Sequence, residues 1–262
     1  MKRCLLCLLA VLLLTGCVVI PSQTTVTPTE TTDAPTETTA TPTETTAAPA
    51  ETTLPLHSRF YIPGVEVEEV IDAFNEVVLA AEFVNGGDPS VLQKWEQPIV
   101  YGLNGAPTQE DLAVLEGFCG WLNSIEGFPG IRQSVGLEEV NLRIHFCEEP
   151  ELRLIMGENF FGVDGAVTFW YDYNVIYDAV ICYRSDIDQY TRNSVILEEI
   201  YNGLGPVQDS DLRTDSIIYS GYSVPQSLTP MDELILRLLY HPDMRCGMNA
   251  RECEAVIRTL YY

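Results

Sequence analysis

The sequence predicts an α+β domain with a mixed sheet, carried behind an export segment and a low-complexity spacer. Two observations lead to this prediction. Beyond residue 56, stretches with the spacing of buried helices alternate with β-rich runs. About 200 residues remain there, which is enough for one domain with a sizeable core. The order helix, strand, helix, three strands, helix, loop, helix indicates a layered α+β or α/β arrangement.

The first half of the domain is expected to hold two helices with a strand between them. Residues 65–84 carry apolar side chains at helical spacing, and Gly86-Gly87 is the expected stop. Residues 98–103 are predicted to form a short strand. A second helix is expected to start at Thr108, which can cap it, with Asp111 at the third position. Its expected buried stripe comprises Leu112, Leu115, Cys119 and Leu122.

Three strands and three helices are predicted for the second half. Residues 140–147 alternate strictly between apolar and polar side chains, which is typical of a strand with one buried face. Two further β-rich runs cover residues 166–171 and 175–183. Helices are expected over residues 187–204, ending at Gly205, over residues 229–240, and after Asn249.

Residues 1–16 are predicted to be a lipoprotein signal peptide. Lys2 and Arg3 precede an apolar run, Leu5 to Leu14, that is too short to span a bilayer but suits a signal peptide. The run leads into Leu-Thr-Gly-Cys, which resembles a bacterial lipobox, and the resemblance implies cleavage before Cys17 and lipidation of its thiol. We therefore expect a membrane-anchored protein on the extracellular face of the cell membrane. The alternative is an ordinary secretory signal.

Residues 17–56 are predicted to form a stalk, and residues 57–262 the folded domain. Most of the stalk is Thr, Pro, Ala and Glu, with a proline every seven residues at Pro28, Pro35, Pro42 and Pro49. A coiled coil is excluded, because apolar heptad positions are missing and the prolines would break a helix. The composition favours an extended spacer, which at ~3.1 Å per residue would reach on the order of 100 Å.

The charge balance argues against one class of function. Asp and Glu total 38 and Lys and Arg total 14, so the formal net charge is −24. Such a surface repels phosphate backbones, and we expect no nucleic-acid partner. A soluble surface outside the cell explains the charge, with binding of calcium or cationic partners as the alternative.

Five cysteines follow the predicted lipidation site: Cys119, Cys147, Cys182, Cys246 and Cys253. Disulfides are allowed in an exported protein, and an odd number leaves at least one thiol unpaired. Cys246 with Cys253, and Cys147 with Cys182, are candidate pairs, and the sequence leaves the pattern open.

The stretch from Glu198 to Gln208 reads Glu-Glu-Ile-Tyr-Asn-Gly-Leu-Gly-Pro-Val-Gln. It is similar, position by position, to the metzincin zinc-protease signature HExxHxxGxxH. Glu199 matches the general base of that motif, and Gly205 matches its glycine. All three ligand histidines are replaced, by Glu198, Asn202 and Gln208.

Two later segments extend the resemblance. Asp215 to Tyr219 looks like the methionine-containing turn of matrixin-type metalloproteases, with Ile218 in place of the methionine, and residues 228–240 look like their C-terminal helix. The chain also resembles a bacterial family of uncharacterised secreted domains related to zincins. That second resemblance rests on Glu198-Glu199, Leu204-Gly205, Leu228-Thr229, Asp232 and Leu239-Tyr240-His241-Pro242. Together they imply a zincin-like, metzincin-type α+β fold with an active-site-type helix and a C-terminal helical part.

The replaced ligands argue against a zinc site. Two histidines four apart on a helix suit zinc, whereas the carboxamides of Asn202 and Gln208 are poor ligands for it. His57, His145 and His241 all lie outside the motif. We therefore expect no metal and no cofactor, although Glu198 and Asn202 share a helix face on which a calcium ion is chemically feasible.

These observations favour a non-catalytic surface lipoprotein whose cleft binds an extracellular peptide or a cell-wall ligand, or is purely structural. Phe169, Trp170 and Tyr171 form an aromatic cluster that is expected to contact the ligand, because a zincin edge strand near this position holds peptides by strand addition. Ordinary strand packing is the alternative for these aromatics. The alternative function is an atypical hydrolase, metal-dependent or not, that uses Glu199 as general base.

Overall fold

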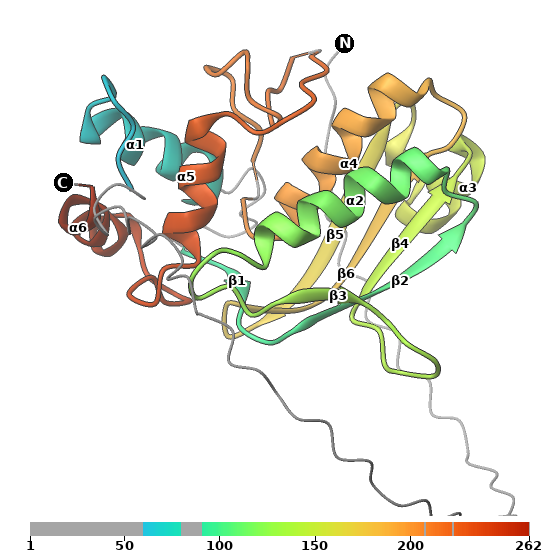
Figure 1. Cartoon of the computed structure of the whole chain (residues 1–262), viewed down its shortest axis with the longest axis horizontal. Coiled ribbons are helices and arrows are strands. Elements are labelled where there is room, and N and C mark those ends of the chain that lie inside the picture. Colours follow the sequence, from blue (N-terminus) through green and yellow to red (C-terminus); the bar gives the residue numbers. More distant parts are fainter. Residues whose placement is uncertain (1–59, 80–90, 207, 222, 262) are drawn as a thin grey trace, which may run out of the picture. The chain divides into compact units, whose positions relative to one another are not determined.

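The computed structural model describes residues 60–79, 91–206, 208–221 and 223–261 of the chain (Figure 1). The predicted signal peptide, the predicted lipidation site Cys17 and the predicted stalk lie outside the described residues. His57 and the predicted stop Gly86-Gly87 also lie outside them. No helix in the described ranges is long and apolar enough to cross a membrane.

A mixed, mostly parallel sheet forms the centre of the domain. Its strands are β1 (Lys94–Trp95), β2 (Ile99–Gly105), β3 (Ile131–Gln133), β4 (Leu142–Cys147), β5 (Gly165–Asp172) and β6 (Val175–Arg184). The spatial order is β1-β6-β4-β2-β3, and every neighbouring pair in this order is parallel. β5 pairs antiparallel with β6 and lies at an edge of the sheet. The predicted mixed sheet is confirmed.

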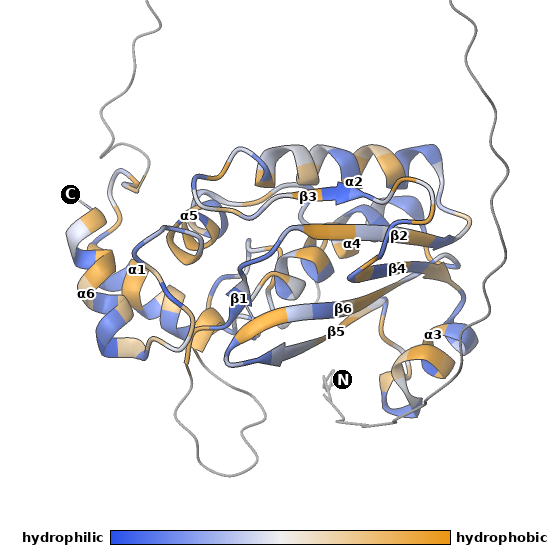
Figure 2. Cartoon of the chain, turned by 90° about the horizontal axis from the view of Figure 1, so that it is seen from below, coloured by the Kyte–Doolittle hydropathy of each residue, from blue (hydrophilic) through white to orange (hydrophobic). Residues whose placement is uncertain are grey.

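Six α-helices are described around the sheet. They are α1 (Val67–Phe74), α2 (Gln109–Leu122), α3 (Glu149–Met156), α4 (Gln189–Gly203), α5 (Pro230–Leu239) and α6 (Ala250–Leu260). A π-helical turn, Asn75–Leu79, continues α1, and a 3-10 turn, Glu158–Phe160, follows α3. α2 and α4 run side by side along the sheet (Figure 1). Figure 2 shows α1, α5 and α6 gathered at one end of the sheet.

The main core lies between the sheet and the pair α2 and α4. Alternate residues of the central strands enter it, including Ile144, Ile181 and Val167, and the stripe of α2 meets them. Within the predicted stripe Leu115, Cys119 and Leu122 are buried, whereas Leu112 is only half-buried and Phe118 is buried in addition. The hydrophobic pattern therefore located this core correctly.

The opposite face of the sheet carries a second, smaller core that the sequence pattern did not predict. Cys147, Ala166, Val180 and Cys182 are buried there beneath Leu152 of α3. The expectation that residues 140–147 have only one buried face is therefore wrong at the end of that strand. α3 escaped prediction because it is short and buries only Leu152, so its sequence carries little periodicity.

The start of α2 follows the predicted capping pattern and also carries a tertiary contact. The Thr108 hydroxyl accepts a hydrogen bond from the Asp111 N–H at 3.1 Å. Asp111 is only 1% exposed, and Arg192 of α4 donates through Nε to its Oδ1 at 2.8 Å. Burial alone would raise the pKa of Asp111, but hydrogen bonds from Arg192, Thr108 and Gln189 hold that pKa below its usual value. This buried ion pair joins α2 to α4.

Candidate functional site

The motif helix is α4, which packs directly on β5 and β6. Asp188 caps it by accepting a hydrogen bond from the Thr191 N–H at 3.0 Å. The approach to β5 is close at Gly165, where an added Cβ would lie 2.4 Å from a methyl carbon of Val195 and 2.9 Å from Oε1 of Glu199. Only glycine at this point of β5 lets the helix lie so near the sheet.

Glu199 is buried as a consequence of this close packing. Its side chain is 5% exposed and lies against Gly165, and Asn202, one turn further, is 7% exposed. Glu198 is half-buried. A general base must reach a substrate or an attacking water, so the burial of Glu199 disfavours that role in this conformation.

The end of α4 is shaped by Gly205, as the motif resemblance implied. Gly205 has a φ of +131°, and an added Cβ would lie 2.5 Å from the carbonyl oxygen of Gln93. Two buried side chains satisfy carbonyls at the end of this helix. The Trp95 indole N–H donates to the Gly203 carbonyl at 2.9 Å, and the Tyr240 hydroxyl donates to the Leu204 carbonyl at 2.7 Å.

Two of the replaced ligand positions, Asn202 and Gln208, make different contacts. Asn202 donates through Nδ2 to Oδ1 of Asp209 at 3.4 Å, and its Oδ1 is buried with no hydrogen-bond partner within the described ranges. Gln208 is half-buried, and its backbone N–H donates to the Val77 carbonyl at 3.3 Å. Asp209, which sequence reasoning did not single out, is therefore the acidic residue that contacts Asn202.

The two described histidines make their contacts elsewhere. His145 lies on β4 between Ile144 and Phe146, which enter the main core, so its side chain points to the opposite face from α4. Burial lowers the pKa of His145. His241 follows α5, where its ring meets that of Phe60 edge-on at 5.4 Å. Across the described ranges, no three His, Cys, Asp or Glu side chains are grouped to hold a metal ion, so these residues do not fit a zinc site.

The loop that resembles the metalloprotease turn is held by Asp232 of α5. Asp232 is fully buried, and its Oδ1 accepts hydrogen bonds from Arg213 and Ser216, each at 2.7 Å. Its Oδ2 accepts from the backbone N–H of Thr229 at 3.0 Å and from that residue's hydroxyl at 2.8 Å, which completes the cap of α5. The Tyr201 hydroxyl of α4 donates to the Asp232 carbonyl at 3.0 Å. One carboxylate thus joins the loop, α5 and α4.

The predicted aromatic cluster is split between the two faces of β5. Phe169 packs against the main core, and its ring centroid lies 6.4 Å from that of Tyr171. Trp170 points to the other face, where the Arg143 guanidinium lies 5.9 Å from its ring centroid. Tyr171 alone of the three is strongly exposed, at 52%.

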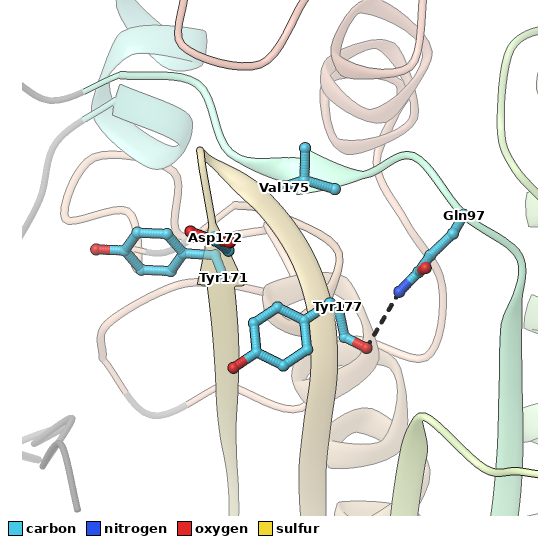
Figure 3. A pocket seen from close by; sticks show the side chains of 5 residues that line it. All are labelled: Gln97, Tyr171, Asp172, Val175 and Tyr177. Carbon is cyan, nitrogen blue, oxygen red and sulfur yellow. Dashed lines mark hydrogen bonds between the residues drawn. The ribbon is translucent and has the colours of Figure 1, made fainter. Parts of the chain in front are cut away.

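A shallow pocket of about 520 Å³ lies beside this exposed tyrosine (Figure 3). It is lined by Gln97, Tyr171, Asp172, Val175 and Tyr177, which come from the β5–β6 hairpin and from the segment between β1 and β2. Of these residues, sequence reasoning singled out only Tyr171. The other four lining residues belong to no recognisable sequence motif. They come together only because strand pairing places the β5–β6 hairpin beside the segment between β1 and β2.

The described fold and site define a mixed α/β domain with a mostly parallel sheet and a buried motif helix. The chain belongs to the family described as a protein of unknown function, DUF2927, whose sequence model matches residues 67–259. No curated protein matches the chain. The predicted membership of an uncharacterised domain family is thus confirmed.

Proposed function

We propose that this protein is a surface lipoprotein with a zincin-like, non-catalytic domain that holds an extended peptide at the outer edge of β5. The observation that carries the proposal is the burial of Glu199 and Asn202 in a helix whose zinc-ligand positions lack histidine. The segments that resemble a protease are present in the chain, whereas the histidines that would bind zinc are replaced and Glu199, which matches the general base, is buried.

Several features of the fold support a zincin-like ancestry. The motif helix α4 directly follows β6, Gly205 redirects the chain at its end, and Asp232 links the downstream loop to α5, which Tyr201 joins to α4. The edge strand β5 is antiparallel to an otherwise parallel sheet. This arrangement agrees with the metzincin-type resemblance of the motif.

Strand addition is the binding mode that the sheet edge favours. β5 pairs with β6 alone among the described strands, so one side of its backbone offers N–H and C=O groups to another chain. An added peptide strand would gain affinity from main-chain hydrogen bonds and selectivity from the side chains along the edge.

The anchoring part of the proposal rests on residues 1–56. A lipidated Cys17 and a Thr/Pro-rich stalk would hold the domain away from the membrane, within reach of wall or surface peptides. The excess of acidic residues suits a domain that stays soluble at that surface.

Hydrogen exchange of the full chain tests the peptide-binding proposal directly. The probe is a mixture of random decapeptides with blocked termini, and the control is the same mixture with N-methylated backbones. We expect protection of amides in residues 165–172 with the first mixture and none with the second. Equal protection by both mixtures, or protection only outside β5, would refute strand addition.

Metal content tests the non-catalytic part. We expect the full chain to retain substoichiometric zinc and calcium after exposure to both ions and dialysis. One ion per chain, lost in Glu198→Ala or Glu199→Ala, would overturn the proposal and favour a metal-dependent hydrolase.

A further inference from the structure

The hairpin between β5 and β6 has an unusual tip. Asp172 and Val175 are the last paired residues, so Tyr173 and Asn174 form a two-residue turn, with φ values of +49° and +66°. Such a turn needs left-handed backbone at both positions, which glycine and asparagine adopt readily and tyrosine does not. Strained positions of this kind concentrate at ligand-binding sites. Tyr173 is nonetheless 88% exposed, so packing does not explain its presence.

A β-bulge lies directly behind this tip. Trp170 pairs with Asp178 and Tyr171 pairs with Ile176, which leaves Tyr177 as an extra residue on β6. Bulges redirect side chains and are common beside functional sites. Tyr177 is 47% exposed, and its carbonyl accepts a hydrogen bond from Nε2 of Gln97 at 3.2 Å (Figure 3). The bulge therefore turns a large aromatic ring outward and fixes it against the neighbouring segment.

The pocket behind the tip offers hydrogen-bond acceptors and aromatic faces. The Asp172 carboxylate can only accept hydrogen bonds, and it forms no ion pair with any residue in the described ranges. One N–H of the Gln97 amide donates to the Tyr177 carbonyl, which leaves the second N–H as a donor and the oxygen as an acceptor. The rings of Tyr171 and Tyr177 lie on the same side of the hairpin in Figure 3. The two tyrosine hydroxyls and the second amide N–H of Gln97 can also donate, so the feature that favours a cation is the carboxylate beside two aromatic rings.

We propose that the pocket formed by Gln97, Tyr171, Asp172, Val175 and Tyr177 binds an organic ammonium group. The Asp172 carboxylate meets the positive charge, the two tyrosine rings attract it through their π faces, and Val175 contacts its carbon substituents. A neutral sugar could hydrogen-bond to these groups, but it carries no positive charge to meet the Asp172 carboxylate.

The charges around the pocket agree with a cationic ligand. Glu96, next to Gln97, is exposed and adds negative potential. The nearby Asp178 is occupied by Arg143 at 2.8 Å. Lys94 is buried and donates to the Leu239 carbonyl at 3.1 Å, so it does not compete for the pocket. The pocket shares Tyr171 and Asp172 with the end of β5, but it uses their side chains whereas strand addition uses the backbone edge, so either proposal can fail without the other.

The test is a nuclear magnetic resonance titration of the full chain in a non-ionic detergent. Choline is the probe, and 3,3-dimethylbutan-1-ol is its neutral isostere. We expect saturable choline binding in the millimolar range, at least about ten-fold tighter than the isostere, with shifts centred on the tyrosines of the pocket. Similar affinity for both compounds would mean an apolar site and refute the proposal.

Matched variants separate this pocket from the general acidity of the chain. We expect Asp172→Asn and Tyr177→Leu each to weaken choline binding at least about five-fold, and Tyr177→Phe, which keeps the ring, to retain it. Glu116→Gln and Tyr190→Leu alter an exposed acid and an exposed tyrosine on other elements and should change nothing. Equal losses in pocket and control variants would reveal diffuse charge attraction. Tighter binding of chitotriose than of choline at the same tyrosines would replace the proposal with a carbohydrate site.

Discussion

Replacement of Asp232 by alanine should destabilise the domain more than any surface substitution. The fully buried carboxylate is the ion-pair partner of Arg213, whose side chain is 15% exposed. Nη1 of Arg213 donates to Asp232, and its Nε and Nη2 have no hydrogen-bond partner among the described residues. Removing Asp232 therefore leaves a buried guanidinium without compensation, which costs about 3–5 kcal/mol, and the lost hydrogen bonds from Thr229 to the carboxylate add about 1 kcal/mol.

The assay is equilibrium urea unfolding of wild type, Asp232→Ala, Arg213→Met and the double variant. Because a domain has only about 5–15 kcal/mol of stability, a loss of this size should lower the unfolding midpoint strongly. Arg213→Met removes the unpaired charge, so the double variant should be more stable than the sum of the two single losses predicts. Thr229→Ala is the control for the cap alone, at about 1 kcal/mol. A loss below about 1 kcal/mol for Asp232→Ala would refute the reasoning, since breaking a buried pair cannot be that mild.

Three further predictions follow from buried contacts. Gly165→Ala should lower the free energy of unfolding by about 1–3 kcal/mol, because the added methyl group would lie 2.4 Å from a methyl carbon of Val195. Urea unfolding measures this loss, and an unchanged midpoint would contradict the close packing. The pKa of Asp111 lies below its usual value in the folded state, so its contribution to stability is present above about pH 4 and is lost as the pH falls further. The wild type should therefore lose more stability than Asp111→Asn between pH 7 and pH 3, and equal losses would count against the buried ion pair. Diamide should oxidise Cys147 and Cys182 to a disulfide and be reduced to its hydrazine, because the two thiols lie within hydrogen-bonding distance of each other. Peptide mapping measures the pairing, and finding only other cysteine pairs would contradict this prediction.

The elements with a clear hydrophobic period could be predicted from the sequence alone. The capping pattern placed the start of α2 correctly, and the alternation of residues 140–147 identified β4 and its face toward the main core. β1 and β3 were missed because strands of two and three residues show no alternation. The π-helical turn after Phe74 was also missed, since it keeps the apolar spacing of the helix that precedes it.

The candidate site was predictable only in part, for a physical reason. The motif spacing correctly implied that Glu199 lies on a helix and that the chain turns at Gly205. Its burial depends on Gly165, which lies 34 residues earlier on another element, and local pattern carries no information about that approach. The pocket at the hairpin tip depends in the same way on strand pairing and on the bulge at Tyr177.

The residues that make this chain resemble a metalloprotease each have a structural task of their own. Gly205 permits a backbone approach to Gln93 that a side chain would block, and Asp232 ties the downstream loop to α5. Under the proposed zincin-like ancestry, selection for folding alone would preserve these positions, whereas nothing in the packing of α4 requires histidine at the ligand positions. A glycine and buried carboxylates at the motif positions, without histidine at the ligand positions, are what the proposal of a non-catalytic binding scaffold predicts.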